Sequence, residues 1–188
     1  MNVYDFDNTI YKGDSTADFY LFSLRKHPSI IKFLPSLIKA ALRFYAFKKG
    51  SKTEMKETMY RFLTKIEPEK DIKAFWDSHE KNIKSWYLKQ KKADDIIISA
   101  SPEFLLEPIC ERLGIKNLTA SRVNARTGKY SGINCHGAEK VRLFKKLYDG
   151  EIDEFYSDSL SDSPLAEISK TAFMVKGNKI EDWKKGDK

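Results

Sequence analysis

The sequence predicts an α/β fold in which a mainly parallel sheet is interrupted by one long helical insertion. Short apolar stretches rich in β-branched or aromatic residues, which are typical of strands buried on both faces, alternate with stretches of helical periodicity. The segment from residue 13 to residue 92 shows almost no strand pattern. Because connections between a strand and a helix usually have about 2–6 residues, we expect this segment to be an inserted helical domain.

The elements are predicted in order from their local patterns. The first strand is expected at 1–4, and the clearest strand is expected at 95–99, where three isoleucines follow one another. A helix over 103–113 should end at Gly114, because glycine is favoured just after the last helical turn. The remaining strands are expected at 118–123, 155–157 and 172–175, a second core helix at 139–148, and the helices of the insertion at 18–26, 29–48, 52–66 and 69–89. These elements predict a core domain of residues 1–12 and 93–188 and a helical cap domain of residues 13–92.

Composition excludes several classes of protein. The 188 residues include 41% hydrophobic and 13% aromatic residues, which are enough for a packed core and argue against a disordered chain. The two cysteines have no CxxC spacing, so we expect a reduced, cytoplasmic protein. No uncharged run reaches the ~18 residues of a membrane span, and an acidic residue as early as Asp5 argues against a signal peptide.

The positive charge of the chain belongs to one segment. The net charge is +7, yet residues 13–92 hold 18 Lys/Arg against 9 Asp/Glu, whereas the rest of the chain is slightly acidic. Between Phe19 and Thr53 there are eight Lys/Arg and no acidic residue. Such a block indicates an anionic partner, which is a membrane surface, a nucleic acid or a charged substrate, or else a solvated basic face. Composition alone leaves these alternatives open.

Acidic residues follow two of the predicted strands. Asp5 and Asp7 come directly after the first strand, and Asp158 and Asp162 come after a later one. Residues i and i+2 of an extended chain share a face, and the carboxyl ends of parallel strands form the ligand crevice of an open α/β sheet. Four carboxylates at that edge would repel one another unless a cation lay among them. Mg²⁺ prefers such hard oxygen ligands.

Two further residues complete a set suited to phosphoryl transfer. The hydroxyl of Ser99, at the end of the predicted strand 95–99, is placed to bind a phosphate oxygen, and Lys140 can neutralise charge on a transferred group. One carboxylate can attack phosphorus to form an aspartyl-phosphate, and a second can protonate the leaving group and then activate water. Two alternatives stay open: Ser99 as an ordinary strand-end hydroxyl, and Asp162 as the cap of a helix that begins near Ser163.

In order and spacing, these residues resemble the four motifs of the haloacid dehalogenase (HAD) superfamily of phosphatases. The run from Asp5 to Thr9 is similar to the DxDxT signature, and Ser99, Lys140 and the acidic pair Asp158/Asp162 stand where the second, third and fourth motifs are expected. The resemblance extends over nearly the whole chain. The position of the insertion is similar to that of the helical cap in the phosphoserine phosphatase-like branch (subfamily IB-like). The resemblance implies a Rossmann-like core.

The resemblance also implies a mechanism. Asp5 would be the nucleophile and Asp7 the general acid and base, and the phosphoryl group would be bound by Thr9, Ser99 and Lys140. The implied cofactor is Mg²⁺, and the implied metal site consists of Asp5, Asp7 through its main-chain carbonyl, and Asp158, with Asp162 supporting bound water. The implied activity is hydrolysis of a phosphomonoester through an aspartyl-phosphate.

Departures from the phosphoserine phosphatase pattern bear on the substrate. Asp14 stands where those enzymes have a glutamate, and Ala100 and Ser101 stand where they have two glycines. These changes reduce the expected specificity for phosphoserine. Segments 135–141 and 156–165 are more similar to a neighbouring branch that includes a phosphatidylglycerophosphate phosphatase. The substrate is therefore expected to be a small phosphorylated metabolite, phosphoserine-like, or a lipid head-group phosphate.

Two other functions compete with hydrolysis. A phosphotransferase or mutase would use the same aspartyl-phosphate and pass the phosphoryl group to an acceptor other than water. A nucleic-acid-binding module would use the basic insertion, but the insertion contains no recognised nucleic-acid motif, and its cations alternate with large aliphatic residues. No specific nucleic-acid partner is therefore expected.

The segment 30–45 has one polar and one apolar face. Lys32, Ser36, Lys39 and Arg43 recur at helical spacing, and large apolar residues occupy the opposite side. Such a helix either lies at the interface of an anionic bilayer, which would make the protein a peripheral membrane protein, or buries its apolar side within the cap. Pro35 is expected to kink the helix or to divide it.

Overall fold

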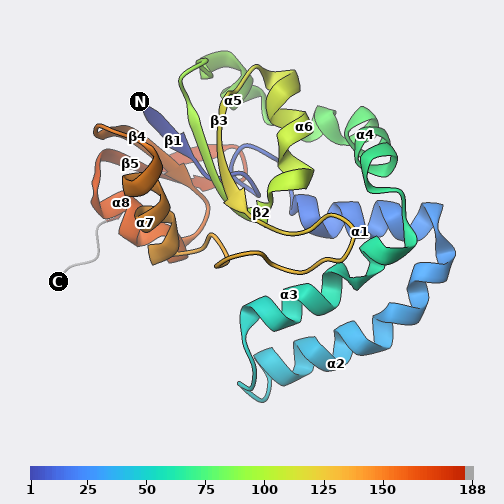
Figure 1. The fold of residues 1–188 in the computed structure, drawn as a ribbon. Helices are drawn as coiled ribbons and strands as arrows, with labels where there is room; N and C mark the ends of the chain where they lie inside the picture. Colours follow the sequence, from blue (N-terminus) through green and yellow to red (C-terminus); the bar gives the residue numbers. More distant parts are fainter. Residues whose placement is uncertain (185–188) are drawn as a thin grey trace.

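The computed structural model describes residues 1–184, which form a six-stranded sheet with helices around it (Figure 1). The strands are β1 (Asn2–Tyr4), β2 (Ile96–Pro102), β3 (Asn117–Ser121), β4 (Ile152–Ser157), β5 (Ser169–Lys176) and β6 (Lys179–Asp182). Their order in the sheet is β3-β2-β1-β4-β5-β6, and β6 pairs antiparallel whereas all the other pairs are parallel. The predicted α/β class with a mainly parallel sheet is therefore confirmed.

The helices fall into two groups along the chain. Between β1 and β2 lie α1 (Ser15–Lys26), α2 (Leu34–Tyr45), α3 (Lys52–Tyr60), α4 (Pro68–His79) and α5 (Ser85–Gln90), with 3-10 turns at Pro28–Phe33, Arg61–Lys65 and Glu80–Asn82. After β2 lie α6 (Glu103–Leu113), α7 (Ala138–Leu147), a 3-10 turn at Leu160–Asp162 and α8 (Ser163–Glu167). The helix α6 has the predicted bounds and ends at Gly114, whose φ is 71°.

The sheet is covered on both faces, as its near-continuous apolar strands predict. Val3, Ile96 and Phe155 contribute to an apolar cluster with residues of α7 and α8. Their strand neighbours Tyr4 and Ile97 point to the opposite face and contribute to a second, larger cluster with residues of α4, α5 and α6. Alternation along each strand thus places successive side chains in different clusters.

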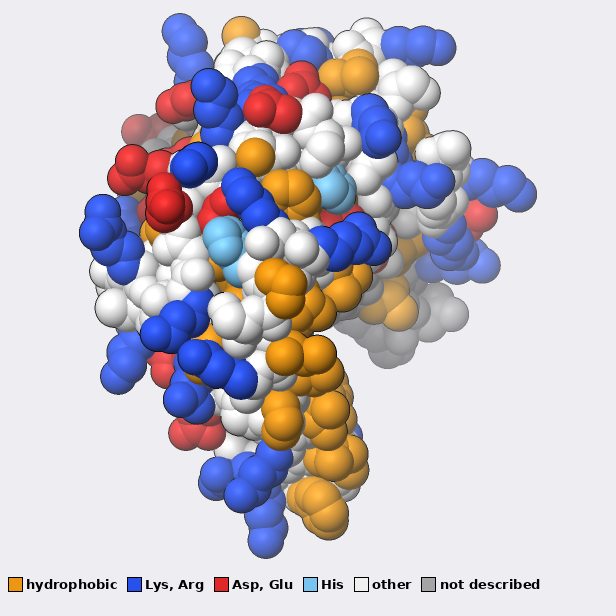
Figure 2. Space-filling model, turned by 90° about the vertical axis from the view of Figure 1, so that its right-hand side faces the viewer, with side chains coloured by type: hydrophobic (Ala, Val, Ile, Leu, Met, Phe, Trp, Pro, Cys, Tyr) orange, Lys and Arg blue, Asp and Glu red, His pale blue; other side chains and the backbone are white. Residues whose placement is uncertain are grey.

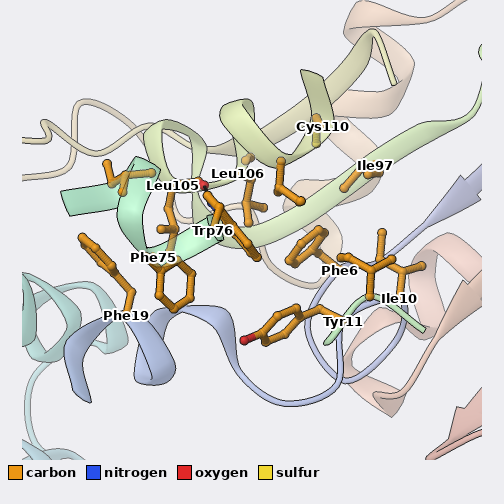
Figure 3. Close-up of a cluster of buried hydrophobic side chains, with 14 of the residues drawn as sticks. Phe6, Ile10, Tyr11, Phe19, Phe75, Trp76, Ile97, Leu105, Leu106 and Cys110 are labelled. Atoms are coloured by element: carbon orange, nitrogen blue, oxygen red, sulfur yellow. Dashed lines mark hydrogen bonds between the residues drawn. The ribbon is translucent and has the colours of Figure 1, made fainter. Parts of the chain in front are cut away.

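The larger cluster joins the sheet to the residue range 13–92, here called the helical insertion. Figure 3 shows Phe6 and Tyr11, from the loop after β1, beside Trp76 of α4. The ring centroids of Phe6 and Tyr11 lie 6.0 and 5.7 Å from that of Trp76, in edge-to-face contact. The indole nitrogen of Trp76 donates a hydrogen bond of 2.7 Å to the carbonyl of Leu105 in α6. One apolar cluster therefore includes residues from both predicted domains.

The prediction of one helix over 69–89 is wrong. The chain leaves the helical conformation at Ile83, which forms an antiparallel bridge with Tyr11, and the amide of Lys84 donates to the carbonyl of Ile10 at 2.8 Å. These backbone bonds require an extended segment between α4 and α5. The predicted helix over 29–48 is divided next to Pro35, since a 3-10 turn precedes α2 and the helix proper begins at Leu34.

The helices α2 and α3 lie side by side and form an arm that projects away from the sheet (Figure 1). The turn between them brings the chain from the end of α2 back toward the core, and Ser51 and Glu54 close the start of α3 with a capping box. None of the helices in residues 1–184 has the length and apolar character needed to cross a bilayer.

Candidate active site

Asp5 directly follows β1, the strand that lies between β2 and β4 in the sheet. The loop after Asp5 is tightly folded, because the amides of Ile10 and Tyr11 both donate to the carbonyl of Phe6 at 3.0 Å. Within it, Asn8 has a φ of 56°, a left-handed conformation that asparagine adopts more readily than most residues. This compact loop begins at the carboxyl end of β1, where the strand order of the sheet changes direction and a ligand crevice is expected.

Lys140 reaches Asp5 from the first turn of α7. Gly137 precedes this helix with a φ of 59° and a ψ of −128°, a conformation open almost only to glycine. The ammonium nitrogen of Lys140 lies 2.6 Å from Oδ1 of Asp5 and 2.7 Å from Oδ2 of Asp162, and the side chain is buried. Burial lowers the pKa of Lys140, but the charges of Asp5 and Asp162 outweigh burial and hold that pKa above its ordinary value.

The two carboxyls of the first motif have different partners. Burial raises the pKa of Asp5 to about 7, although the charge of Lys140 lowers it. Asp7 lies away from Lys140: the amide of Ser15 donates to its Oδ1 at 2.7 Å, and the hydroxyl of Ser101 donates to its Oδ2. Burial and the neighbouring charge of Asp14 raise the pKa of Asp7 to about 6. A carboxyl with a pKa near neutrality suits proton transfer in both directions.

The loop after β4 brings the second acidic pair to the same place. The hydroxyl oxygen of Thr9 lies 3.4 Å from Oδ2 of Asp5 and 3.5 Å from Oδ1 of Asp158, and it accepts a hydrogen bond of 3.0 Å from the amide of Asp158. Asp162 accepts hydrogen bonds through Oδ2 from Lys140 and from the hydroxyl of Ser157, the latter at 2.8 Å. Although Asp162 is the N-cap residue of α8, its side chain makes no capping hydrogen bond there.

Ser99 lies on β2, next to β1, and is buried. Its hydroxyl oxygen accepts a hydrogen bond of 3.1 Å from the amide of Ser101, in a region where the pairing of β2 with β3 is irregular. The structure thus brings together all of the sequence-predicted site residues around one cavity of about 400 Å³. Those that line it directly are Asp5, Asp7, Ser99, Lys140, Asp158 and Asp162, and Thr9 lies behind them as a buried bridge between Asp5 and Asp158.

The helical insertion supplies the opposite wall of the cavity, through residues that the sequence did not identify. That wall includes Tyr45, Lys52, Met55, Lys56 and Met59. The ammonium of Lys56 donates to the carbonyl of Ala100 at 2.9 Å and to Oδ1 of Asn134 at 3.3 Å, so α3 is bonded to the segment that follows Ser99. Burial, with a smaller effect of Lys52, lowers the pKa of Lys56 to about 8. Nothing in the sequence pattern distinguishes Lys56 from the other lysines of the insertion.

Lys84 is another lysine of the insertion that the sequence did not mark, and its side chain is buried. Its ammonium donates to the carbonyl of Asn8 in the loop after β1 and to the carbonyl of Gly177 after β5, the latter at 2.6 Å. Lys84 therefore connects the loop after β1, which carries the first motif, to the turn between β5 and β6. The break between α4 and α5 is the feature that could have drawn attention to Lys84. This break exists because residues 82–84 pair with residues 10–12.

The donor set at the base of the cavity fits Mg²⁺. Asp5, Asp158 and Asp162 offer hard oxygen atoms, and Lys140 donates hydrogen bonds to Asp5 and Asp162. Burial raises the pKa of Asp158, although the charges of Lys140 and Lys84 lower it, and a bound cation would favour its carboxylate form. Residues 1–184 contain no group of three or more His, Cys, Asp or Glu side chains arranged to hold a metal ion. Mg²⁺ commonly uses one or two protein carboxylates and completes its coordination with waters and substrate phosphate.

The sequence matches the model of the haloacid dehalogenase-like hydrolase family over residues 3–167, and the chain belongs to this family. The predicted family is thus confirmed, and with it the prediction of an enzyme of the hydrolase type. The match includes both acidic motifs, Ser99 and Lys140.

Individual proteins that match this chain have limited sequence identity with it. A Mycobacterium tuberculosis protein named as a probable phosphatase is 33% identical over 90 residues, which are 44% of this chain and only 31% of that protein. Protein CicA of Caulobacter vibrioides is 24% identical over a match that covers 89% of this chain and 82% of CicA. The chain thus spans about a third of the mycobacterial relative but most of CicA.

Solved structures share the fold. A Bordetella pertussis protein of unknown function superposes with a TM-score of 0.72 at 19% identity, over 92% of this chain and 87% of that one. A phosphoserine phosphohydrolase-like protein of Francisella tularensis has a TM-score of 0.55 at 19% identity, over 92% and 86% of the two chains. The arrangement of sheet and helical insertion is therefore found in other proteins.

Proposed function

We propose that this protein is a Mg²⁺-dependent phosphomonoester hydrolase that acts through an aspartyl-phosphate at Asp5. The observation that supports the proposal is the contact of buried Lys140 with both Asp5 and Asp162, in a cavity that Ser99 and Asp158 also line. A nucleophilic carboxylate, an adjacent fixed ammonium and a buried hydroxyl are the groups that phosphoryl transfer needs.

In the first step, an oxygen of Asp5 attacks phosphorus while the bond from phosphorus to the ester oxygen breaks. Asp7, protonated at that stage, gives its proton to the departing alkoxide. Lys140 and Ser99 donate hydrogen bonds to the phosphoryl oxygens, where negative charge is concentrated. The product alcohol leaves, and the phosphoryl group stays as an acyl phosphate on Asp5.

In the second step, Asp7 accepts a proton from a water molecule as that water attacks phosphorus. The bond between phosphorus and the Asp5 oxygen breaks, which regenerates the carboxylate and releases inorganic phosphate. Ser15 and Ser101 hold Asp7 through both of its carboxyl oxygens, so the same group is kept in position for both proton transfers.

Asp5 and Asp158 are the residues that would hold Mg²⁺, with Asp162 supporting bound water and the main-chain carbonyl of Asp7 as a further oxygen donor. When bound there, Mg²⁺ supplies positive charge to the phosphoryl oxygens. The contacts of Thr9 with both carboxylates keep Asp5 and Asp158 side by side.

The substrate class is a phosphomonoester without a strong requirement for an ammonium group. The side chain of Asp14, the residue that stands in place of the phosphoserine phosphatase glutamate, caps α1 by accepting a hydrogen bond of 2.9 Å from the amide of Ala17. A carboxylate occupied in this way is less available to a substrate ammonium. The wall formed by Tyr45 and Met55 instead offers apolar surface to the alcohol part of the ester.

The test is turnover of an aryl phosphate with Mg²⁺ by the wild type and by the Asp5→Asn variant. We expect Asp5→Asn to lose activity by several orders of magnitude, because an amide is not a nucleophile toward phosphorus, and the exposed variant Asp149→Asn to behave like the wild type. Full activity of Asp5→Asn would refute the aspartyl-phosphate. Transfer of phosphate to added alcohols or sugars in preference to water would identify a phosphotransferase instead.

A further inference from the structure

One face of α2 is apolar and uncovered. Ile31 in the preceding turn, Ile38, Leu42 and Tyr45 recur at helical spacing, and each is more than half exposed, as is Phe47 just beyond the helix. No residue of α2 is fully buried. Figure 2 shows these hydrophobic side chains as a column along the projecting arm.

The contact of α2 with α3 uses a different side of the helix. Leu37 and Phe44 are half-buried, as is Phe33 in the preceding turn, and α2 and α3 lie against each other along the arm. Ile30, which the sequence placed on the apolar face, is buried in the core. The sequence left open whether the apolar side of this segment is covered by the rest of the insertion. The structure shows that Ile30 is covered and that the column formed by Ile31, Ile38, Leu42, Tyr45 and Phe47 is not.

Cations border this column. Lys32, Lys39 and Arg43 lie along one side of it and are exposed, and the turn after α2 adds Lys48 and Lys49. The whole stretch from Phe19 to Thr53 contains no acidic residue. Figure 2 shows Lys and Arg side chains next to the hydrophobic column. A helix that has large apolar residues on one side, cations beside them and no acidic residue of its own is typical of helices that lie in a bilayer interface.

We propose that α2 and the turn after it dock on an anionic lipid bilayer. The apolar column would enter the boundary between head groups and acyl chains, and the cations would contact the lipid phosphates. Charge favours this occupant over a second copy of the chain, because two such faces would bring Lys39 and Arg43 of each copy together. A nucleic acid would satisfy the cations but would leave Ile38 and Leu42 in contact with phosphate and water.

The docking face adjoins the candidate active site. Tyr45, the last residue of α2, belongs to the apolar column and also lines the cavity that contains Asp5. Met55 and Met59 of α3 continue this apolar surface along the cavity wall. A docked α2 would therefore hold the cavity at the membrane surface, where phosphomonoesters of the head-group layer are found. This last step rests on the proposed function, whereas docking itself does not.

The test is sedimentation of the full chain with vesicles of phosphatidylcholine, with and without phosphatidylglycerol. We expect the wild type to pellet with anionic vesicles at low salt and to be released at high salt, because salt screens the cations. The double variants Ile38→Ser/Leu42→Ser and Lys39→Glu/Arg43→Glu should each bind at least about tenfold more weakly. Leu88→Ser and Lys73→Glu are matched controls at exposed positions on other helices and should bind like the wild type.

Three results would overturn the proposal. They are a wild type that stays in the supernatant with anionic vesicles at low salt, equal binding of the Ile38→Ser/Leu42→Ser variant, and a lipid-free wild-type dimer that this variant converts to a monomer. None of the substituted residues lies in the catalytic set, so all variants should hydrolyse a water-soluble aryl phosphate at the wild-type rate. Vesicle binding without any hydrolysis would refute the proposed function and leave the docking proposal supported.

Discussion

The ammonium nitrogen of Lys140 lies 2.6 Å from Oδ1 of Asp5, although the two residues are 135 positions apart in the chain. The same nitrogen contacts Asp162, so one buried cation connects the end of β1, the start of α7 and the turn after β4. Two carboxylates share this one ammonium. The contacts of Lys140 with Asp5 and Asp162 are therefore expected to affect both the free energy of unfolding and the catalytic rate.

Lys140→Met should destabilise the protein strongly. Methionine keeps most of the volume but removes the charge, which leaves Asp5 and Asp162 buried without their counter-charge. Breaking a buried ion pair on one side typically costs about 3–5 kcal/mol, and we expect a loss of that size in the free energy of unfolding without Mg²⁺. Urea unfolding measures it, with the exposed Lys145→Met of the same helix as the control. Equal midpoints for the two variants would contradict the prediction.

Mg²⁺ should stabilise the folded protein through Asp158. A ligand that binds only the native state at about 100 times its dissociation constant adds about 2.7 kcal/mol to the free energy of unfolding, which appears as a higher Tm. We expect this increase in the wild type and in Asp149→Asn, and its loss in Asp158→Asn or on addition of EDTA. An undiminished Mg²⁺ effect in Asp158→Asn would place the ion elsewhere.

Gly128→Ala should destabilise the contact between the β3–α7 connection and the helical insertion. Gly128 has a φ of 73°, and a Cβ there would lie 2.6 Å from both Cβ and the carbonyl oxygen of Tyr60, the last residue of α3. The left-handed conformation costs about 1 kcal/mol and the overlap about 1–3 kcal/mol more. Gly132→Ala is the matched control, since a Cβ at Gly132 meets no atom within 4 Å. Thermal unfolding of both variants checks the difference.

Lys56 should make the stability depend on pH in the alkaline range. Its pKa falls to about 8 in the folded protein, so the folded state disfavours the ammonium form relative to the unfolded chain. This cost is fully present below about pH 8 and disappears as the pH rises toward the ordinary lysine pKa of about 10.4. The wild type should therefore gain stability relative to Lys56→Met between pH 7 and 10, as measured by urea unfolding. The difference in the free energy of unfolding between the wild type and Lys73→Met, a variant at an exposed position, should not change with pH in this range.

Much of the fold could be predicted from local pattern because buried parallel strands are apolar throughout. The isoleucines of β2 and the short apolar start of β1 predict these two strands, and Gly114 marks the end of α6. The site followed from three adjacent strands, since Asp5 and Asp158 directly follow β1 and β4, and Ser99 lies on β2 where its regular pairing with β3 stops. Their convergence needs only the rule that these ends meet at one edge of the sheet.

What could not be predicted depends on contacts between distant segments. The break at Ile83 exists because Tyr11 pairs with it, and no local pattern reports a partner so far away. Every residue of β6 is exposed, so this strand has no run of buried apolar residues, although it pairs with β5. The bonds of Lys56 to Ala100 and Asn134 likewise become visible only when α3 is placed against the segment after β2.

The central place of β1 has a consequence for synthesis of the protein. β1 is synthesised before the other strands of the sheet, but its neighbours are β2 and β4, and Asn2 finds its partner Glu154 only 152 residues later. At about 5–20 residues per second, this strand waits roughly 8–30 s for its second edge to be paired. A nascent chain stalled before β4 would thus have one edge of β1 unpaired and would lack Asp158 and Asp162. In such a chain the unpaired edge of β1 would be open to chaperones and to aggregation.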